Sequence, residues 1–418
     1  MNLELNSLMT LFLTSICLLL GIFLKEKIKL LQRFCIPSPV VGGFLASLII
    51  WAGRSLDLFT VSFNTSLQSY FMTAFFITVG LEGSFRLIKS GGLILMLYVG
   101  IAWFVAIGQS SIGIVLAKLF GEASVLGVMA GSVPLSGGHG GAVAFGNMAV
   151  EYTGSDLPLV VALTTATFGL IVGSLLGGPV ASYLISRYRI PITTEKVGQN
   201  VEKQIEEQME DSKKEENIFI EPINGIKFPH FLKMFAVILI LIIVGEWLNQ
   251  LLKYIIPSIG FPTYITAMLA AIIMRNLNDK LKLIEFRETS LTLISSFSLG
   301  IFLTMAMMSL KIWEIQSVAL PLLVIWIAQV AFLLSFTVFI VFRMLGKNYD
   351  AAVMCSGLLG HGFGATPTAM ANMNSVCERY NLVSLKAFLI VPLTGAVLVE
   401  VLQIPYQSWL ISILTAVH

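Results

Sequence analysis

Long apolar segments alternate with short polar ones along most of this chain. A helix that crosses the hydrocarbon core of a bilayer needs about 20 mainly apolar residues, and many of these segments approach that length. The pattern predicts an all-α polytopic membrane protein, with the short tail Pro405–Val417 left unassigned. The expected complete spans are Leu8–Leu24, Ile36–Trp51, Leu67–Leu87, Leu93–Ala117, Leu157–Ile185, Phe231–Leu252, Phe261–Met274, Leu291–Leu310, Ala319–Phe342 and Leu385–Leu402.

Two further apolar segments are broken by glycine. Ala123–Val150 contains SGGHGG at residues 136–141, and Ala351–Ser375 contains GHGFGA at residues 360–365. Non-helical backbone at membrane depth survives only where it is buried in protein or lines a cavity, because lipid offers no hydrogen bonds. We therefore expect each broken segment to be a re-entrant hairpin that enters and leaves on the same side.

A charged segment separates the chain into two membrane parts. It includes VEKQIEEQMEDSKKEEN at residues 201–217, which is typical of a solvated linker. The predicted organisation is a first membrane repeat at 1–186, a cytoplasmic linker at 187–230, and a second, inverted membrane repeat at 231–418.

The basic residues test this ten-span topology. With the N-terminus outside, 22 of the 26 Lys and Arg residues lie on one side, which the positive-inside rule assigns to the cytoplasm. Long loops count less in this rule, and several of the 22 lie in the linker. The four basic residues left outside are Arg54, Lys118, Lys253 and Lys311.

The two membrane parts also resemble each other. LFGEASVLGVMAG (119–131) aligns with MLGKNYDAAVMCS (344–356) at a shift of 225 residues, and the same shift pairs Pro37 with Pro262 and Asn147 with Asn372. Five spans per repeat is an odd number, so the second repeat must be upside down relative to the first. Inverted repeats are typical of secondary transporters, whose binding site lies near the midplane at the repeat interface.

Composition agrees with a membrane transporter. The chain is 56% hydrophobic and 12% charged, whereas soluble domains carry about 25% charged residues. The first apolar segment follows Glu4 and lacks a signal-peptide cleavage site, so we expect it to remain as a helix. The net charge of +2 says little about partners, and no nucleic-acid partner is expected. The four cysteines show no metal-binding spacing and are expected to be free thiols.

The hairpin tips are the candidate binding site. A helix end at membrane depth offers free N–H groups that suit a carboxylate and free carbonyls that suit Na⁺, and glycine permits close backbone approach. The candidate substrate-binding residues are Ser136, Gly137, Gly138, His139, Gly140, Asn147, His361, Gly362, Phe363, Gly364, Thr366, Thr368 and Asn372. Pro367 is expected to break the helix where the second hairpin resumes.

Each polar candidate also has a purely structural interpretation. The histidines could bond substrate or hairpin backbone, and the two asparagines could join helices. Thr164, Thr165 and Thr394 are candidate sodium ligands, although a threonine in a membrane helix often bonds its own i−4 carbonyl. Intramembrane acids are functional candidates, but Glu82 lies four residues before Arg86 and could pair with it, and Glu400 could lie near the outer interface.

The longest motifs resemble the bacterial sodium/glutamate symporter family. They are SGGHGG, GHGFGATPTAMANM (360–373), GKNYDAAVM (346–354), TATFGLIVGSLLGGP (165–179) and FLIVPLTGA (388–396). The resemblance covers nearly the whole chain except the linker. It implies two oppositely oriented re-entrant loops, sodium-coupled import of L-glutamate by an elevator-like motion, Na⁺ as coupling ion without a cofactor, and a homodimer in the bacterial inner membrane. Departures are the segment PLSGGHGGA (134–142) and the acid at Glu82.

The sequence is also compatible with other functions. The substrate could be another dicarboxylate or acidic amino acid. A channel could also use glycine-rich backbone as a filter, although filters usually arise from subunit symmetry. An intramembrane enzyme is disfavoured because the sequence has no G-x-S-x-G, no H-E-x-x-H and no Walker A motif.

Overall fold

The structure is a computed structural model that describes residues 2–33, 36–82, 85–192, 228–255, 262–282, 284, 286 and 288–416. Most of the linker at 187–230, and Cys35, lie outside these residues. The described chain is mainly helical, and a short parallel pairing joins β1 (Asn2–Leu5) to β2 (Thr60–Phe63). Cys17, Cys355 and Cys377 are free thiols, as the sequence predicts.

The helices of the first half follow the expected segments. They are α1 (Ser7–Lys27), α2 (Lys29–Arg33), α3 (Ser38–Ser55), α4 (Gln68–Glu82), α5 (Phe85–Leu119), α6 (Ser124–Met129), α7 (Ser132–Thr153) and α8 (Leu157–Tyr188). Asn6 caps α1 by accepting a hydrogen bond from the Met9 N–H (2.9 Å), and Pro37 precedes α3, where its missing N–H costs nothing.

The second half is helical as well. Its elements are α10 (Phe228–Ile255), α11 (Thr263–Leu281), α12 (Glu288–Met308), η1 (Ile312–Val318), α13 (Ala319–Phe336), η2 (Thr337–Val341), α14 (Phe342–Met344), α15 (Tyr349–Phe363), α16 (Thr366–Tyr380), α17 (Leu385–Leu393), η3 (Thr394–Leu398) and α18 (Val399–Ala416). The tail left unassigned by the sequence continues as helix α18, with Pro405 inside it.

Several helices are long and apolar enough to cross a membrane. Among the described residues these are Ser7–Lys27, Gly92–Leu119, Leu157–Tyr188, Phe228–Ile255, Thr289–Met308 and Ile312–Met344, with Gln68–Leu81 as a shorter apolar helix. The protein is therefore a multi-pass membrane protein.

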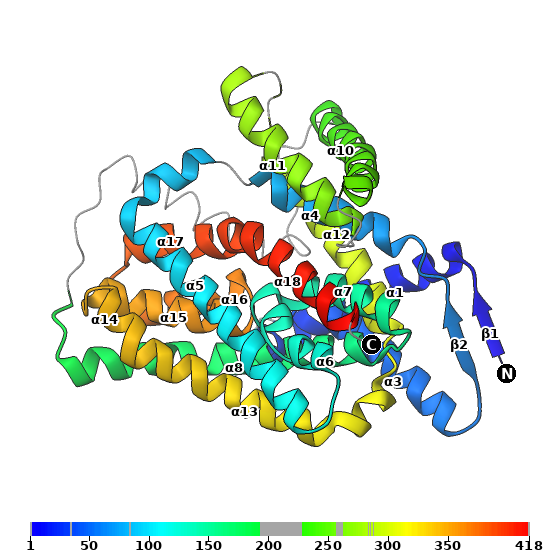
Figure 1. Cartoon of the computed structure of the whole chain (residues 1–418), viewed down its shortest axis with the longest axis horizontal. Helices are drawn as coiled ribbons and strands as arrows, with labels where there is room; N and C mark the ends of the chain where they lie inside the picture. Colours follow the sequence, from blue (N-terminus) through cyan, green and yellow to red (C-terminus); the bar gives the residue numbers. More distant parts are fainter. Residues whose placement is uncertain are drawn as a thin grey trace.

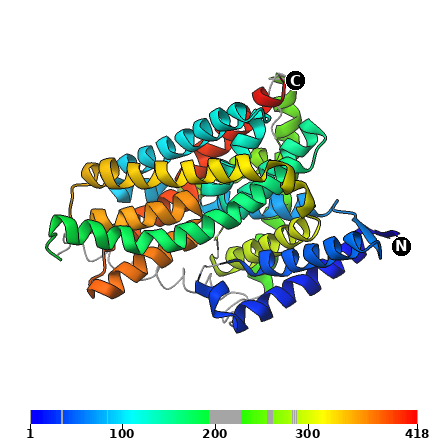
Figure 2. The same cartoon turned by 90° about the horizontal axis from the view of Figure 1, so that it is seen from below.

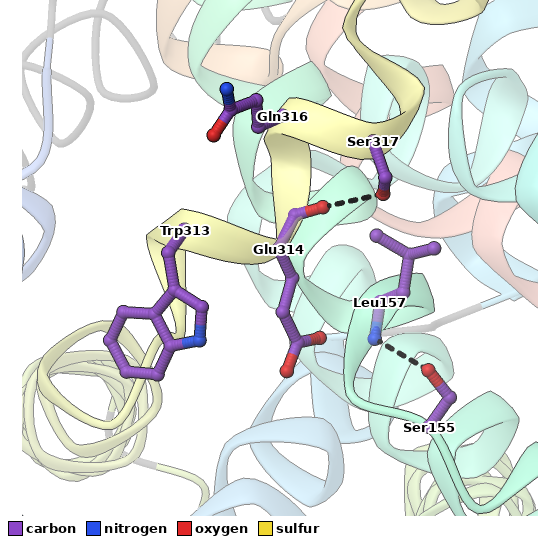
Figure 3. A pocket seen from close by; sticks show the side chains of 6 residues that line it. All are labelled: Ser155, Leu157, Trp313, Glu314, Gln316 and Ser317. Atoms are coloured by element: carbon purple, nitrogen blue, oxygen red, sulfur yellow. Dashed lines mark hydrogen bonds between the residues drawn. The ribbon is translucent and has the colours of Figure 1, made fainter.

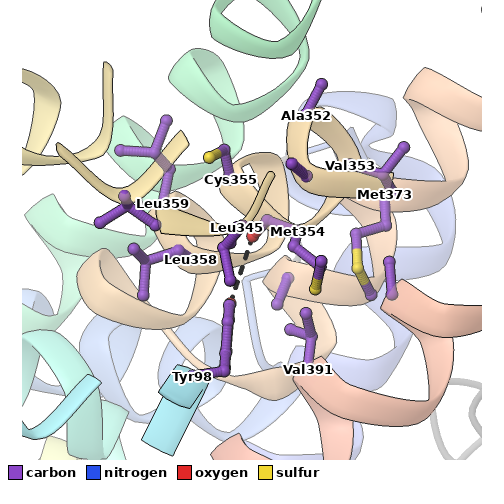
Figure 4. Packing of buried hydrophobic residues seen from close by; sticks show 14 of the residues in the cluster. Tyr98, Leu345, Ala352, Val353, Met354, Cys355, Leu358, Leu359, Met373 and Val391 are labelled. Carbon is purple, nitrogen blue, oxygen red and sulfur yellow. Dashed lines mark hydrogen bonds between the residues drawn. The ribbon is translucent and has the colours of Figure 1, made fainter. Parts of the chain in front are cut away.

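The helices form two groups (Figures 1 and 2). One apolar cluster joins α4, α10, α11 and α12, and a smaller one joins α1 to α12. A larger cluster joins α5, α8, α13 and α15 to α17, and its centre is α15 (Figure 4), where the Tyr98 hydroxyl donates to the Met354 carbonyl at 3.2 Å. A further cluster, which includes α7, connects the two groups.

Candidate substrate and ion site

The first broken segment is a helical hairpin. Helix α7 is interrupted at Gly138, whose φ of 57° and ψ of −158° are not helical. A Cβ on Gly141 would lie 3.1 Å from the Val133 carbonyl oxygen, whereas eight residues of continuous helix would separate those positions by about 12 Å. The chain therefore turns back on itself at Gly138.

The second broken segment is a helical hairpin as well. Helix α15 ends at Phe363, and α16 begins at Thr366. A Cβ on Gly360 would lie 2.5 Å from the Cα of Ala369, and one on Gly357 would lie 3.0 Å from the Met373 sulfur. Residues farther from the turn on α15 thus face residues farther from the turn on α16, so the two helices run antiparallel.

The tips of the two hairpins meet. A Cβ on Gly138 would lie 3.2 Å from the Gly364 carbonyl oxygen and 3.5 Å from the Ala365 Cβ. Glycine is therefore required at position 138 for two reasons. Its φ is positive, and the facing backbone of Gly364 leaves little room for a side chain. Helix ends from both halves of the chain come together at this point.

The two histidines have different surroundings. His139 is 4% exposed, and its Nε2 lies 3.0 Å from the Thr167 hydroxyl on α8. His361 is 3% exposed, and neither ring nitrogen has a partner among the described residues. A Cβ on Gly395 would lie 2.9 Å from both His361 Nδ1 and Thr366 Oγ1, so these two polar groups face the same π-helical turn, η3. π-Turns are frequent at functional sites.

Glutamine side chains hold the first hairpin, and the sequence reasoning missed them. The Ser136 hydroxyl donates to the Ser132 carbonyl at 2.7 Å and receives a hydrogen bond from Gln403 on α18. Gln403 also donates to the Ser132 carbonyl (3.2 Å), and Gln407 donates to the Ser132 hydroxyl (3.3 Å). An amide within an apolar segment is a signal that could have identified them.

The two asparagines occupy matching positions but differ in their contacts. Asn372 is buried and donates to the carbonyls of Gly173 (2.9 Å) and Ser356 (3.4 Å), which is an interhelical structural role. Asn147 is half-buried, and its side chain has no recorded hydrogen bond within the described part of the chain. Only Asn147 therefore keeps its amide available.

The three threonines proposed as sodium ligands lie within helices. Thr164 donates to the Val160 carbonyl and Thr394 to the Ile390 carbonyl, both at 2.8 Å, while Thr165 accepts from Trp326 at 2.9 Å. Hydroxyls that donate in this way still present lone pairs.

The remaining candidates lie along the hairpins. A Cβ on Gly137 would meet no atom within 4 Å, whereas one on Gly140 would lie 3.5 Å from Phe75. Phe363 and the side chain of Thr368 are fully buried, and the Thr368 hydroxyl lacks a partner among the described residues. A Cβ on Gly362 would lie 2.8 Å from Leu333, so this glycine serves packing.

The two acids singled out in the sequence have different outcomes. The side chain of Glu82 lies outside the described residues. Glu400 has one carboxylate oxygen buried without a hydrogen-bond donor in the described structure, and it lies one helical turn before Gln403. Within the described ranges, no group of three His, Cys, Asp or Glu side chains could hold a metal ion.

A pocket lies away from the tips, at the start of α8 (Figure 3). It is lined by Ser155, Leu157, Trp313, Glu314, Gln316 and Ser317. Leu157 is ten residues before Thr167, which corresponds to about 15 Å along a helix. The pocket is therefore a feature of the rim rather than of the hairpin tips.

Comparisons with known proteins identify the family. Residues 3–382 match the family model described as sodium/glutamate symporter. The chain is 35% identical over 398 residues to the sodium/glutamate symporter of Haemophilus influenzae, covering 94% of each chain. It is 34% identical over 402 residues to the sodium/glutamate symporter of Escherichia coli strain K12, covering 96% of each chain. These relatives are named as transporters, not enzymes, and the chain belongs to the sodium/glutamate symporter family.

Proposed function

We propose that this protein imports L-glutamate together with Na⁺ and binds the substrate between the two glycine-rich tips. The observation that carries the proposal is the approach of Gly138 to Gly364 and Ala365, which brings helix ends from both hairpins to one point. The names of the relatives supply the substrate and the ion.

Backbone groups at the tips would bind the carboxylates. The second limb of α7 begins after Gly138, and α16 begins after Ala365, so each presents the free N–H groups of a first helical turn. His361 and Thr366 face the same tip and add side-chain donors. One hydrogen bond to a charged group contributes about 1.5–3 kcal/mol, so a few of them suffice for binding.

The sodium ligands would lie among oxygen atoms near the tips. Thr164 and Thr165 lie on α8, which packs against both hairpins, and Thr394 begins η3, whose Gly395 faces His361 and Thr366. Their hydroxyl oxygens and the carbonyls freed at the helix breaks are hard ligands of the kind that Na⁺ prefers.

We propose that the two halves are inverted repeats. Helix α3 begins at Ser38 and α11 at Thr263, the same shift of 225 that relates the sequence motifs, and α6 and α15 begin at Ser124 and Tyr349. The packing is reciprocal as well, because α3 packs against α12 while α11 packs against α4. Exchange of equivalent partners in this way is expected of two units related by a two-fold axis.

Charged residues at the two ends of the molecule support the ten-span, re-entrant topology. Arg54 lies over the Trp313 ring at 4.5 Å, and Lys311 pairs with Asp156, so two basic residues assigned to the outside share one rim. At the other end, Arg343 donates to the Tyr188 hydroxyl at 3.4 Å, beside Arg187 and Arg189. Those three arginines belong to the predicted cytoplasmic set.

An elevator-like motion would carry the tips across the membrane. In this proposal α5 to α8 and α13 to α18 move together against a scaffold of α1, α3, α4 and α10 to α12. The surface between them near the first hairpin is apolar and aromatic, with Phe75 against Gly140 and Tyr264 against Phe145, whose ring centroids are 6.1 Å apart. Apolar contacts of this kind can be exchanged without breaking hydrogen bonds, so the moving helices can slide past the scaffold at a low cost in free energy.

We also propose a homodimer in the bacterial inner membrane. Helices α1 and α10 carry many exposed apolar side chains, among them Phe12, Phe23 and Trp247, which lipid or a second copy must cover. Native mass spectrometry of the protein in detergent would measure the copy number, and a monomer at all concentrations would contradict the dimer.

Uptake into vesicles tests the proposed function. Purified protein in proteoliposomes should accumulate labelled glutamate only with an inward Na⁺ gradient, and reversing the gradient should abolish accumulation. Each elementary charge moved gains about 2.3 kcal/mol per 100 mV, so cotransport of two or more Na⁺ would make uptake voltage-dependent. A panel of dicarboxylates distinguishes glutamate from other substrates. Non-saturating flux that ignores the Na⁺ gradient would indicate a channel instead.

A further inference from the structure

Two glutamines lie fully buried beside the second hairpin and are not among the candidate residues from the sequence. Gln109 is on α5 and Gln329 is on α13, and both side chains are 0% exposed. Their helices are otherwise strongly apolar, and both belong to spans long enough to cross a membrane. A buried carboxamide in such a helix is costly unless each of its polar atoms is satisfied.

The amide nitrogens form a chain that ends at the hairpin. Gln329 Nε2 donates to the Gln109 main-chain carbonyl at 2.8 Å, and Gln109 Nε2 donates to the Gly362 carbonyl at 2.8 Å. Gly362 lies two residues before the tip residue Gly364. This chain therefore connects α13, through α5, to the backbone that turns at the second tip.

The hydrogen bonds fix which way each carboxamide points. Both nitrogens face carbonyl oxygens, and rotating either amide would place an oxygen against an oxygen. The two carboxamide oxygens must therefore point elsewhere. Neither Gln109 Oε1 nor Gln329 Oε1 has a hydrogen-bond donor among the described residues, and both are buried.

Unpaired buried acceptors of this kind are destabilising, because they lose their hydrogen bonds to water without gaining others. A cation would satisfy them, because carboxamide and carbonyl oxygens are hard ligands. The recorded partners of both glutamines are neutral groups, and the described residues include no cluster of acids or imidazoles that could hold a divalent metal. Neutral oxygen ligands without a carboxylate favour a monovalent cation over Ca²⁺ or Mg²⁺.

We propose that the carboxamide oxygens of Gln109 and Gln329 are ligands of a Na⁺ ion beside the second hairpin. This inference deepens the proposed function, since it names a place for the coupling ion. Na⁺ on Gln109 Oε1 polarises that amide and strengthens the donation from Nε2 to Gly362. The ion thereby holds the second tip in the conformation that meets Gly138, so that Na⁺ binding favours glutamate binding.

The first test is Na⁺-dependent thermal stability of the purified full chain without glutamate. A ligand that binds only the folded state stabilises it in proportion to the logarithm of its concentration. Wild-type protein should gain stability with Na⁺ at constant ionic strength made up with choline chloride. Gln329→Met should raise the half-saturating Na⁺ concentration about tenfold, as expected for loss of one ligand worth about 1.4 kcal/mol.

Two further variants distinguish a ligand from a packing residue. Gln329→Glu keeps an oxygen for the ion and adds negative charge. It gives up the donation to the Gln109 carbonyl, but the added charge should still lower the half-saturating Na⁺ concentration. It also serves if Gln329→Met does not fold. The matched control is Ser111→Ala, because this exposed serine on α5 bonds only the Ile107 carbonyl, and it should leave the Na⁺ dependence unchanged.

The outcomes separate this inference from the proposed function. A half-saturating Na⁺ concentration unchanged within twofold in Gln329→Glu, or in folded Gln329→Met, would overturn the site and leave glutamate transport intact. Opposite shifts in the two variants, in a protein that fails to bind glutamate, would support the site and overturn the proposed substrate. Equal stabilisation by K⁺ and choline would overturn the site as well.

Discussion

The two hairpins make the same kind of turn by different means. The first turns at one residue, Gly138, whose φ of 57° is in the region that favours glycine. The second turns through Gly364 and Ala365, whose φ values of −147° and −160° are both negative, and Pro367 then restarts the helix. The two segments therefore have similar composition but different requirements. Gly138 is needed for its positive φ, whereas Gly364 has a negative φ and close neighbours.

The hairpins are also held differently. Hydroxyl and amide side chains hold the first, through Ser132, Ser136 and Gln403. Close backbone packing on α8 holds the second, in addition to the amides of Gln109 and Asn372: a Cβ on Gly169 would lie 2.0 Å from the Phe363 carbonyl oxygen, and one on Gly173 would lie 3.1 Å from the Phe363 Cβ. The second hairpin should therefore be the more sensitive of the two to added bulk on α8.

The largest effect is expected where α8 supports the second hairpin. Gly169→Ala forces the Phe363 backbone and Leu135 to move, because its Cβ would lie 2.0 Å from one and 2.8 Å from the other. Overpacking of this kind costs about 3 kcal/mol, and the loss should be measurable as a lower thermal midpoint and loss of uptake. Gly178→Ala on the same helix is the control, since its nearest neighbour would be 3.8 Å away. Equal stability of both variants would contradict the packing difference.

The next effect separates the two tips. Gly138→Ala places a Cβ at positive φ, which costs about 1–2 kcal/mol, and pushes it toward Gly364. Glutamate affinity measured by calorimetry should fall about tenfold or more. Gly364→Ala should cost less, because φ is negative there and its Cβ would lie 3.1 Å from both the Gly360 carbonyl oxygen and the Thr368 hydroxyl, contacts that a shift of a few tenths of an ångström relieves.

Gly154→Ala is the control for backbone strain, because Gly154 also has positive φ (67°) but lies at the exposed end of α7 with open space around it. It should lower stability and leave affinity unchanged. A Gly364→Ala variant that binds more weakly than Gly138→Ala would reverse the comparison.

A smaller effect should follow from loosening the first hairpin alone. Gln403→Leu removes two hydrogen bonds, to the Ser132 carbonyl and the Ser136 hydroxyl, and leaves only the bond between those two groups; each lost bond is worth about 1 kcal/mol. We expect glutamate affinity to fall about tenfold with folding retained. Ser412→Ala, on the same helix, removes only a bond to the Ser408 carbonyl and should change nothing. Equal affinity in Gln403→Leu and wild type would show that Gln403 does not position the tip.

The smallest effect is expected at the rim. Lys311 pairs with Asp156, and both side chains are exposed. Exposed pairs contribute about 0.2–1 kcal/mol and weaken in salt. Lys311→Met should therefore shift the thermal midpoint by about 2 °C or less at low salt, with no difference from the Lys253→Met control at high salt. A loss of uptake in Lys311→Met would contradict this expectation and would show that the rim takes part in transport.

Much of the fold could be predicted from the sequence. Apolar length located most helices, although α5 begins eight residues before the expected span and α11 ends seven residues after it. Glycine within apolar segments located both helix breaks, because both signals are local. The end of the chain was less predictable: the last expected span ended at Leu402 and the short tail from Pro405 was left unassigned, yet α18 continues to Ala416. Packing against the first hairpin, through Gln403 and Gln407, accounts for that continuation.

The sequence indicates only part of what surrounds the two tips. The tip glycines could be singled out because a break in an apolar helix is visible in the sequence. The partners of each side chain depend on which helices pack together, which a single sequence does not state. Asn147 and Asn372 match in position yet differ in contacts for this reason, and Gln109, Gln329 and Gln403 were missed among apolar neighbours.

The central claim is that the substrate binds where the two tips meet, and cysteine protection at Gly137 tests it most directly. A Cβ at this position meets no atom within 4 Å, so Gly137→Cys should fold and transport. Alkylation of this cysteine by a small polar reagent should slow about tenfold when Na⁺ and glutamate are both present, and not with either alone, while Ser155→Cys at the rim should be unaffected. An alkylation rate at residue 137 that is unchanged by Na⁺ and glutamate, in a protein that still transports, would contradict the account.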